Sequence, residues 1–471
     1  MSNPTRTLGR SQSTLFQPAG HLRGAKLIRI DRVYFIGFCS AAMGLALAVS
    51  IAHHRGVAFG LPLDDGWIHA AFAKNLALDH TWGLLAGERS GGESSLLWPA
   101  VLALGELGGA GLAPVLSLAL GAMSFLALPG LVGHLASIPA RGRVVAVAIG
   151  LCGPLLFAAL SGMETVPALS FGTAALVFLR RGHVGRAAIC TGIAAMLRPD
   201  ALLLIPVLAA GAASTALKTQ ENSLPDLLHR WLRLWPAAVF AILVITSLSL
   251  LEQHFPPATL AGRRWIVGLP QEVDLSQAPA GFLELCRQWV NALFADLGAG
   301  RVLDRLPFAP AWRTTWACAA IFGTALGLFS SFKRSSARTH LSTRLLFAWT
   351  ILALVFYAVV LPDRGHAGRY QPQVYVCFIV LAVEGICALA AMSLRMAPLA
   401  FAAAGIFGAG IAITEVETAD LWCTAVDHIN NLHVSAAAQI EGITAPDDLV
   451  AVFDVGAVAY ARSRKLLDIS G

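Results

Sequence analysis

Two adjacent carboxylates, Asp64 and Asp65, directly follow the first apolar span of a chain that is hydrophobic along most of its length. Acidic side chains at the edge of a membrane are costly to place and are commonly functional. A carboxylate pair there can take a proton from a hydroxyl group or ligate a divalent metal ion. Capping of the helix that follows needs only one Asp, so this alternative leaves the second acid unexplained.

A further acid, Glu164, occurs in Ser161-Gly-Met-Glu164, between two apolar spans. Loop charge predicts that this turn lies on the same side of the membrane as the aspartates, and a carboxylate there could ligate a metal ion or contact the acceptor. The same four residues also fit a capping box, in which a Ser and a Glu three positions later satisfy the first N–H groups of a helix. The sequence is compatible with both roles at once.

Basic residues in the segments predicted to lie outside the cell can bind a phosphate. Arg369 precedes a long apolar span, beside Tyr370 and close to His366, and a guanidinium there can hold a phosphate through two hydrogen bonds. The alternative is that Arg369 only extends to lipid head groups. Arg263 and Arg264 form a second basic pair, for which an ordinary solvated loop charge is the alternative.

Three more polar residues are candidates for substrate contact. Arg198 and Asp200 flank Pro199 within an apolar stretch, where an ion pair between them would by itself explain their presence near lipid. His69 follows Asp65 by one helical turn, so it can reach an acceptor or rest at the membrane interface.

The composition indicates what kind of elements must position these residues. Of the 471 residues, 56% are hydrophobic and 13% are charged, and the mean hydropathy is +0.67. A soluble domain has about 25% charged residues, so most of this chain belongs in lipid. The net charge of +6 is not a nucleic-acid patch, because aromatic residues do not interleave the Arg and Lys. The eight cysteines contain no Cys-x-x-Cys motif that would indicate zinc or redox chemistry.

Apolar runs near the length of a membrane span predict an all-α polytopic membrane protein with about eleven helices. The stretch 187–213 is predicted to be a hairpin of two short helices that turns at Arg198-Pro199-Asp200, and residues 94–108 are short for a span. The predicted spans are residues 33–52, 112–135, 143–160, 164–180, 232–251, 312–332, 345–361, 371–393 and 397–414.

Loop charge predicts the orientation, because Lys and Arg concentrate on the cytoplasmic side of a membrane. Residues 1–32 form a basic tail, which we expect in the cytoplasm, and residues 33–414 form the transmembrane domain. The predicted outer segments include residues 53–93, with the Asp-Asp motif, and the large loop 252–311. A helix at residues 67–76 carries an apolar face and is predicted to lie flat at the interface, with His69, Lys74 and Asn75 away from that face.

Residues 415–471 change character and are predicted to form a small α/β segment outside the cell. They contain a helix at about 420–443, a strand at 449–453 and a second strand near 466–469. The sequence leaves open whether this segment is a tiny unit or one that is cut short.

The order of these motifs resembles the GT-C superfamily, the polytopic glycosyltransferases that use lipid-phosphate sugars. The chain is most similar to the bacterial branch that contains mycobacterial arabinofuranosyltransferases, and more distantly to protein O-mannosyltransferases and aminoarabinose transferases. The resemblance covers nearly the whole chain. It rests on Asp64-Asp65, Gly87-Glu-Arg-Ser-Gly-Gly-Glu-Ser-Ser95, Ser161-Gly-Met-Glu-Thr165, Leu197-Arg-Pro-Asp200, Phe255-Pro-Pro-Ala-Thr, Arg369-Tyr370 and Phe453-Asp-Val-Gly-Ala457.

The resemblance implies an inverting glycosyltransferase in a bacterial inner membrane, with its active site and C-terminus outside the cell. Asp64 or Asp65 would be the base for the acceptor hydroxyl, Glu164 the second acid, and Arg369 a contact for the donor phosphate. The implied donor is a polyprenyl-phosphate sugar that carries a hexose or a pentose, and the implied acceptor is a cell-envelope glycan, lipid or protein. The candidate cofactor is a divalent cation, Mg²⁺ or Mn²⁺, held by Asp65 and Glu164.

Two other classes of function fit the composition. A transporter or flippase for a lipid-linked sugar or another envelope precursor would bury its charges at the middle of the bilayer and often shows inverted repeats. Here the charges cluster near one face and no repeat stands out. The other alternative is a membrane scaffold that keeps the fold without catalysis, and release of sugar from a labelled lipid donor would distinguish it from an enzyme.

Overall fold

The computed structural model describes residues 31–216, 224–252, 258–270, 272–298, 308–333, 340–462 and 464–469. Nearly all of the predicted basic tail and the Phe255-Pro-Pro motif lie outside these residues. The fold described below is that of the unit Arg32–Gly471.

The chain is an integral membrane protein, because six of its described helices are long and apolar enough to cross a bilayer. A seventh span is possible if α5 (Pro139–Gly150) and α6 (Gly153–Ala159), which are bent by 60° at a short break, count as one. The six are α1 (Arg32–Arg55), α4 (Leu112–Gly133), α14 (Ala309–Phe332), α15 (Leu341–Val360), α16 (Gln373–Met392) and the run that begins with α17 (Ala397–Ile429).

Shorter apolar helices complete the membrane part. They are α3 (Leu97–Gly108), α7 (Thr165–Arg180), α8 (Val184–Leu197), α9 (Leu204–Ala216) and α11 (Trp235–Glu252). With 12 residues, α3 is about 18 Å long, shorter than a hydrocarbon core of about 30 Å. Three further described helices are α10 (Leu224–Leu232), α12 (Ala258–Ile266) and α13 (Ala278–Leu297).

The predicted hairpin within 187–213 is confirmed. Helix α8 ends at Leu197, before Pro199, and a short 3₁₀ turn (Pro199–Leu203) leads into α9. The end at this point is expected, because the residue before a proline is disfavoured in a helix. The chain then returns along α7, since Gly172 packs against Leu204 and Gly211 against Leu179.

Helices α14 and α16 pack closely through glycines. A Cβ on Gly385 would lie 1.8 Å from the carbonyl oxygen of Gly323, and one on Gly327 would lie 1.9 Å from that of Leu381. Small residues at such crossings let helix backbones approach, which drives helix association in lipid. Trp316 of α14 fills the neighbouring space and stacks on Phe407 of α17, with ring centroids 5.7 Å apart.

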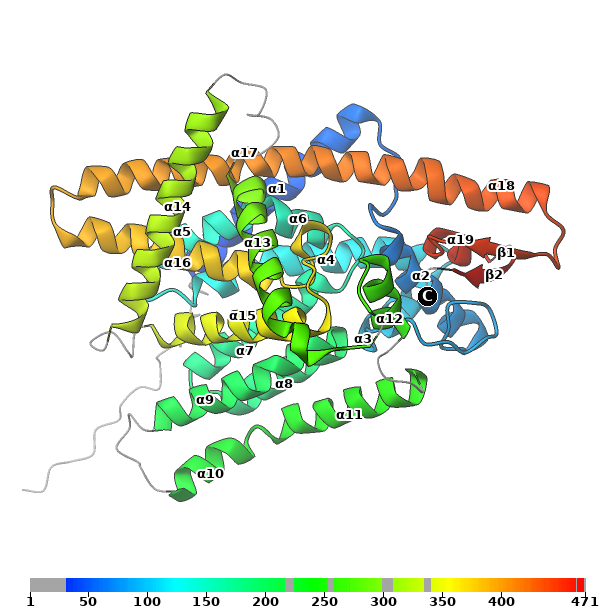
Figure 1. Ribbon diagram of the computed structural model, residues 1–471, viewed down its shortest axis with the longest axis horizontal. Helices are drawn as coiled ribbons and strands as arrows, with labels where there is room; N and C mark the ends of the chain where they lie inside the picture. Colours follow the sequence, from blue (N-terminus) through cyan, green and yellow to red (C-terminus); the bar gives the residue numbers. More distant parts are fainter. Residues whose placement is uncertain are drawn as a thin grey trace, which may run out of the picture. The chain divides into compact units, whose positions relative to one another are not determined.

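The C-terminal segment lies against helix α2 (Asp64–Asp79) (Figure 1). Helix α17 continues without interruption past residue 415 and through a π-helical turn (Asn430–Val434) into α18 (Ser435–Ile443). Strands β1 (Leu449–Val452) and β2 (Lys465–Asp468) then pair in parallel, with Leu449 opposite Lys465, and α19 (Gly456–Ala461) connects them. Both predicted strands are therefore present.

Helix α2 differs from the expected interfacial helix in the exposure of its polar side. His69 and Asn75 are buried, because the loop that follows α2 and the C-terminal segment cover the polar face of the helix, which we expected to be exposed. Asn75 donates to the carbonyl oxygens of Gly83 and Leu84, and Lys74 donates to the carbonyl oxygen of Tyr460.

Candidate active site

Asp65 lies between two arginines that come from distant parts of the chain. Its Oδ1 accepts a hydrogen bond from Arg263 of α12 at 2.6 Å, and its Oδ2 is paired with Arg369, from the loop before α16. Burial alone would raise the pKa of Asp65, but the charges of Arg369 and Arg263 outweigh it and hold that pKa well below its usual range. Asp65 is therefore ionised and the three side chains carry a net single positive charge.

Arg369 is held in place by a tightly turned loop. Gly365, Ala367 and Gly368 all have positive φ, and a Cβ on Gly368 would lie 2.6 Å from the rings of Trp289 and Tyr375. Ala367 is a non-glycine residue in this region, a strained conformation that persists only when its surroundings enforce it.

Two anchors fix that loop to α13. Gln371 accepts from the Trp289 indole at 2.9 Å, and Arg364 pairs with Asp296 at 2.8 Å. The loop therefore presents Arg369 at a defined position, where its guanidinium also lies over the Tyr370 ring, 5.2 Å from the centroid.

The neighbouring arginines of α12 differ in role. Arg264 is buried and donates to the main-chain carbonyl oxygens of Pro270, Val360 and Glu272 at 2.6 to 2.8 Å, and to that of Val359 at 3.5 Å. It thereby attaches α12 to the end of α15. Arg263, one residue earlier, is 36% exposed at its side chain and turns to Asp65 instead. A substrate contact by Arg264 stays a prediction.

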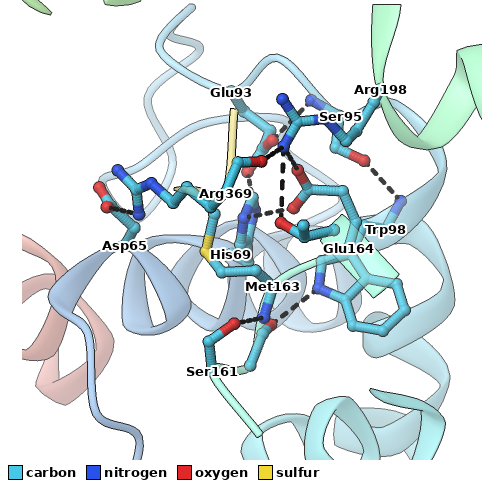
Figure 2. A network of polar contacts seen from close by, with 12 residues as sticks. Asp65, His69, Glu93, Ser95, Trp98, Ser161, Met163, Glu164, Arg198 and Arg369 are labelled. Atoms are coloured by element: carbon cyan, nitrogen blue, oxygen red, sulfur yellow. Dashed lines mark hydrogen bonds and ion pairs between the residues drawn. The ribbon is translucent and has the colours of Figure 1, made fainter. Parts of the chain in front are cut away.

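His69 lies one turn after Asp65 on α2 and is enclosed by two glutamates (Figure 2). Its Nδ1 is 2.5 Å from Glu93, and its Nε2 is 3.0 Å from Glu164. Burial would lower the pKa of His69, but Glu93 and Glu164 outweigh it and raise that pKa to about 10. The imidazole is thus a cation at neutral pH, and in turn it helps to lower the pKa of Glu164 against the effect of burial.

This arrangement predicts a loss of stability at alkaline pH. A folded pKa of about 10 lies above the unfolded value of about 6.5. The folded state therefore retains a proton that the unfolded state has lost, and the stabilisation present below pH ~6.5 falls by about 1.4 kcal/mol per pH unit up to the folded pKa. We expect the melting temperature of the wild type in detergent to fall more between pH 7 and 10 than that of His69→Gln. Equal falls in both proteins would contradict this.

Glu164 connects His69 to the helix hairpin. Helix α2 approaches the 161–164 loop, which carries Glu164, so closely that residue 66 must be glycine. A Cβ on Gly66 would lie 2.7 Å from the Ser161 carbonyl oxygen. Glu164 is 3.6 Å from Arg198 and forms no capping hydrogen bond with α7. The capping-box alternative is therefore wrong: the positive charges of His69 and Arg198 attract this carboxylate away from the helix end.

Arg198 sits at the centre of the network. It pairs with Asp200 at 3.1 Å, as the sequence predicted, and donates to the Tyr357 hydroxyl and the Arg369 carbonyl oxygen, both at 3.0 Å. Polar contacts thus run continuously from Asp65 through Arg369, Arg198 and Glu164 to His69 and Glu93 (Figure 2).

Asp64 has a different environment from Asp65. Its carboxylate accepts from the backbone N–H groups of Gly456 and Ala457, at 2.6 and 3.0 Å, and lies 3.4 Å from His433. It therefore satisfies the N-terminus of α19 rather than that of α2. Burial raises the pKa of Asp64, although these two hydrogen bonds oppose the shift.

Loss of Asp64 is expected to loosen the C-terminal segment. Asp64→Ala leaves two N–H groups without their acceptor, and loss of a capping carboxylate costs about 0.5–2 kcal/mol. We expect faster amide hydrogen exchange across residues 456–461, with a smaller effect in Asp64→Asn, which keeps one acceptor oxygen. Unchanged exchange in Asp64→Ala would show that these contacts do not hold the segment.

The site also contains residues that the sequence did not single out. Glu93 is fully enclosed and its second oxygen accepts from the Ser95 N–H at 2.7 Å. The available signal was an acid within a Gly-Gly-Glu-Ser-Ser run, a composition typical of a tightly folded loop. His433 belongs to a π-helical turn, which periodicity does not reveal. Tyr357, which contacts Arg198, was hidden inside an apolar span.

The remaining predicted residue, His366, is exposed and begins the short 3₁₀ turn that precedes Arg369. Partial desolvation of the His366 ring and the charge of Arg369 lower the pKa of this residue, so it adds no positive charge at neutral pH. Its contact with a substrate stays a prediction.

A divalent cation does not fit Asp65 and Glu164 as they are arranged. Each oxygen of Asp65 faces an arginine, and Glu164 faces His69 and Arg198. A cation would have to displace these positive groups. Among the described residues no cluster of three or more His, Cys, Asp and Glu has the arrangement of a metal site. The predicted metal ligands stay a prediction.

No protein-family model matches the chain, and no curated protein sequence matches it. Solved structures do. ArnT from Cupriavidus metallidurans bound to undecaprenyl phosphate matches over 91% of this chain and 85% of that one, with a TM-score of 0.52 and 15% identity.

Two structures from Archaeoglobus fulgidus match 92% of this chain. The oligosaccharyltransferase AglB, in complex with an inhibitory peptide and a dolichol-phosphate, has a TM-score of 0.52 and 12% identity, with 64% of its length covered. An oligosaccharyltransferase in complex with Zn and sulfate has a TM-score of 0.54 and 11% identity, with 62% covered. At these identities the likeness is one of fold.

Proposed function

We propose that this chain, which has the GT-C fold that ArnT and AglB share, is an inverting glycosyltransferase that uses a polyprenyl-phosphate sugar. The sugar passes to a hydroxyl group of a cell-envelope glycan, lipid or protein. The observation that carries this proposal is a single carboxylate, Asp65, flanked by two guanidiniums at the start of α2. The fold supports the same reading, because the ArnT structure contains undecaprenyl phosphate.

The chemistry requires a base and a cationic site close together. Asp65 takes the proton of the acceptor hydroxyl while the oxygen of that hydroxyl forms a bond to the anomeric carbon of the sugar. The bond from that carbon to the phosphate oxygen breaks, and its electron pair stays on the phosphate. Attack opposite the leaving group inverts the anomeric carbon. Arg263 and Arg369 stabilise the phosphate, because guanidiniums match its geometry and keep their charge.

The other residues of the network position these groups. Arg198 donates to the carbonyl oxygen of Arg369, and His69 holds Glu164 against Arg198. Asp64 acts on the C-terminal segment and not on the acceptor. An oligosaccharyltransferase of the same fold contains Zn, but Asp65 and Glu164 would have to leave their positive partners to hold Mg²⁺ or Mn²⁺ here, and no step above depends on a cation.

The proposed location follows from loop charge and from the nature of the donor. The N-terminus lies in the cytoplasm, and the active site and the C-terminal segment lie outside a bacterial inner membrane. The polyprenyl chain of the donor stays in lipid while its phosphate reaches α2 at the water edge. This proposal is supported by the charged groups, which gather where α2, the 161–164 loop and the loop before α16 meet.

The experiment that tests this function uses membranes that contain the full chain and a panel of radiolabelled polyprenyl-phosphate sugars, both hexoses and pentoses. We expect transfer from at least one donor to endogenous envelope material and none with Asp65→Ala at equal expression. Purified protein that transfers no sugar from any donor and also fails to bind undecaprenyl phosphate would refute the proposal.

A further inference from the structure

Asp65 occupies a position that suits an incoming anion. Each of its oxygens faces a different guanidinium, which is also how two arginines would hold a phosphate. Arg369 is 5% exposed at its side chain and Arg263 is 36% exposed. One side of this anion site is therefore rigid and enclosed, and the other side opens to the surroundings.

The same contacts make Asp65 a weak base. A general base works best when its pKa is near the working pH, whereas Arg369 and Arg263 hold the pKa of Asp65 well below its usual range. Asp65 can take the proton of a hydroxyl only if at least one of the two arginines moves away from its carboxylate. The neighbouring Asp64 does not offer a free carboxylate instead, because it is engaged with α19.

We propose that the donor phosphate displaces Asp65 from Arg263 and Arg369, so that the carboxylate is released as a base only when the donor is bound. This inference rests on the proposed function and adds an order of events to it. In the resting state Asp65 occupies the place of the phosphate between the two arginines and keeps their side chains in position. The donor then exchanges with it, which couples proton abstraction to the presence of a sugar to transfer.

Charge balance supports the exchange. Before reaction, the ionised Asp65, two arginines and a phosphodiester with one negative charge add up to zero. During transfer Asp65 gains the acceptor proton and becomes neutral, while the departing polyprenyl phosphate becomes a monoester with about two negative charges. The two arginines then face two negative charges, and the sum is again zero. No uncompensated charge is left at the edge of the bilayer.

Arg369 and Arg263 differ in how freely they can move, because one lies in an anchored loop and the other at the end of a short helix. The loop of Arg369 is anchored to α13 through Gln371 and Arg364, so this guanidinium has little freedom. Arg263 lies in the last turn of the nine-residue helix α12, and its only described side-chain partner is Asp65. Arg263 is therefore the first of the two arginines to leave Asp65 and bind the phosphate. Arg264 keeps helix α12 in place during this change, because it is fixed to main-chain carbonyl oxygens.

Binding of undecaprenyl phosphate to purified protein in nanodiscs tests the exchange. If Asp65 competes with the phosphate, Asp65→Asn removes the competing charge and is expected to bind about tenfold tighter or more, a change of about 1.4 kcal/mol. Asp420→Asn is the matched control, because Asp420 pairs with Arg55 between α1 and α17, and it should bind like the wild type. Equal or weaker binding by Asp65→Asn would mean that Asp65 only supports the arginines, and the exchange would be rejected.

A second measurement covers the case in which Asp65→Asn folds poorly. Calorimetric titration in buffers of different ionisation enthalpy reports protons taken up when the phosphate binds. At pH 5 a buried carboxylate that is released from the arginines is partly protonated, whereas one held by both arginines is not. At that pH we expect the wild type to take up more protons than Arg263→Lys, in which the exchange is impaired. Asp64, His69 and His366 lie near Asp65 and are common to both proteins. Equal proton uptake would overturn the exchange, whereas a wild type that binds no phosphate would refute the proposed function itself.

Discussion

Replacement of Asp65 by alanine is expected to lower the kcat of sugar transfer by about 10²–10⁴-fold, the range that a positioned general base contributes. Asp65→Asn should lose as much, because an amide keeps the shape but cannot take the proton. The measurement is initial rates with purified protein, a labelled polyprenyl-phosphate sugar and saturating acceptor. Binding of the lipid donor should survive in both variants, since Arg263 and Arg369 remain.

Asp64→Asn is the internal comparison for that result. Its side chain accepts from backbone N–H groups of the C-terminal segment, and one of its oxygens survives the change. We expect a modest loss of rate that follows the loosening of residues 456–461. If Asp64→Asn abolishes transfer while Asp65→Asn keeps wild-type activity, the two acids have been assigned the wrong way round.

Replacement of Arg369 by alanine should raise the KM for the donor more than it lowers kcat. A charge-assisted hydrogen bond contributes about 1.5–3 kcal/mol, which corresponds to roughly a 10- to 150-fold weaker interaction with the phosphate. The loss of kcat is expected to be smaller, because Arg263 remains to stabilise the departing phosphate. Steady-state kinetics with varied donor measure both effects.

Two variants make the Arg369 result interpretable. Arg369→Lys keeps the charge without the forked geometry and should fall between the wild type and the alanine variant. Arg287→Ala removes an exposed arginine that pairs with Glu284 inside α13 and should leave both constants unchanged. A donor KM in Arg369→Ala that matches the wild type would remove Arg369 from the phosphate site.

The relation between sequence and fold is clearest in the helices. Long apolar runs specify spans because every backbone polar group in lipid must be satisfied within a helix, and α4, α15 and α16 follow the predicted runs within a few residues. The turn at Arg198 was predictable for a local reason, the proline that follows. The continuous helix through residue 415 was not, because polar residues near that point suggested a boundary where the backbone has none.

The sequence by itself determined that acids and arginines gather near the ends of apolar helices, which predicts chemistry at the edge of a membrane. Only the tertiary structure decided how they pair. Asp64 and Asp65 are neighbours in the chain, yet one contacts α19 and the other contacts α12 and the loop before α16. His69 is enclosed by acids from residues 93 and 164. Successive side chains on a helix point about 100° apart, so the identity of each partner depends on which distant segment covers which face of α2, and local sequence carries no record of that.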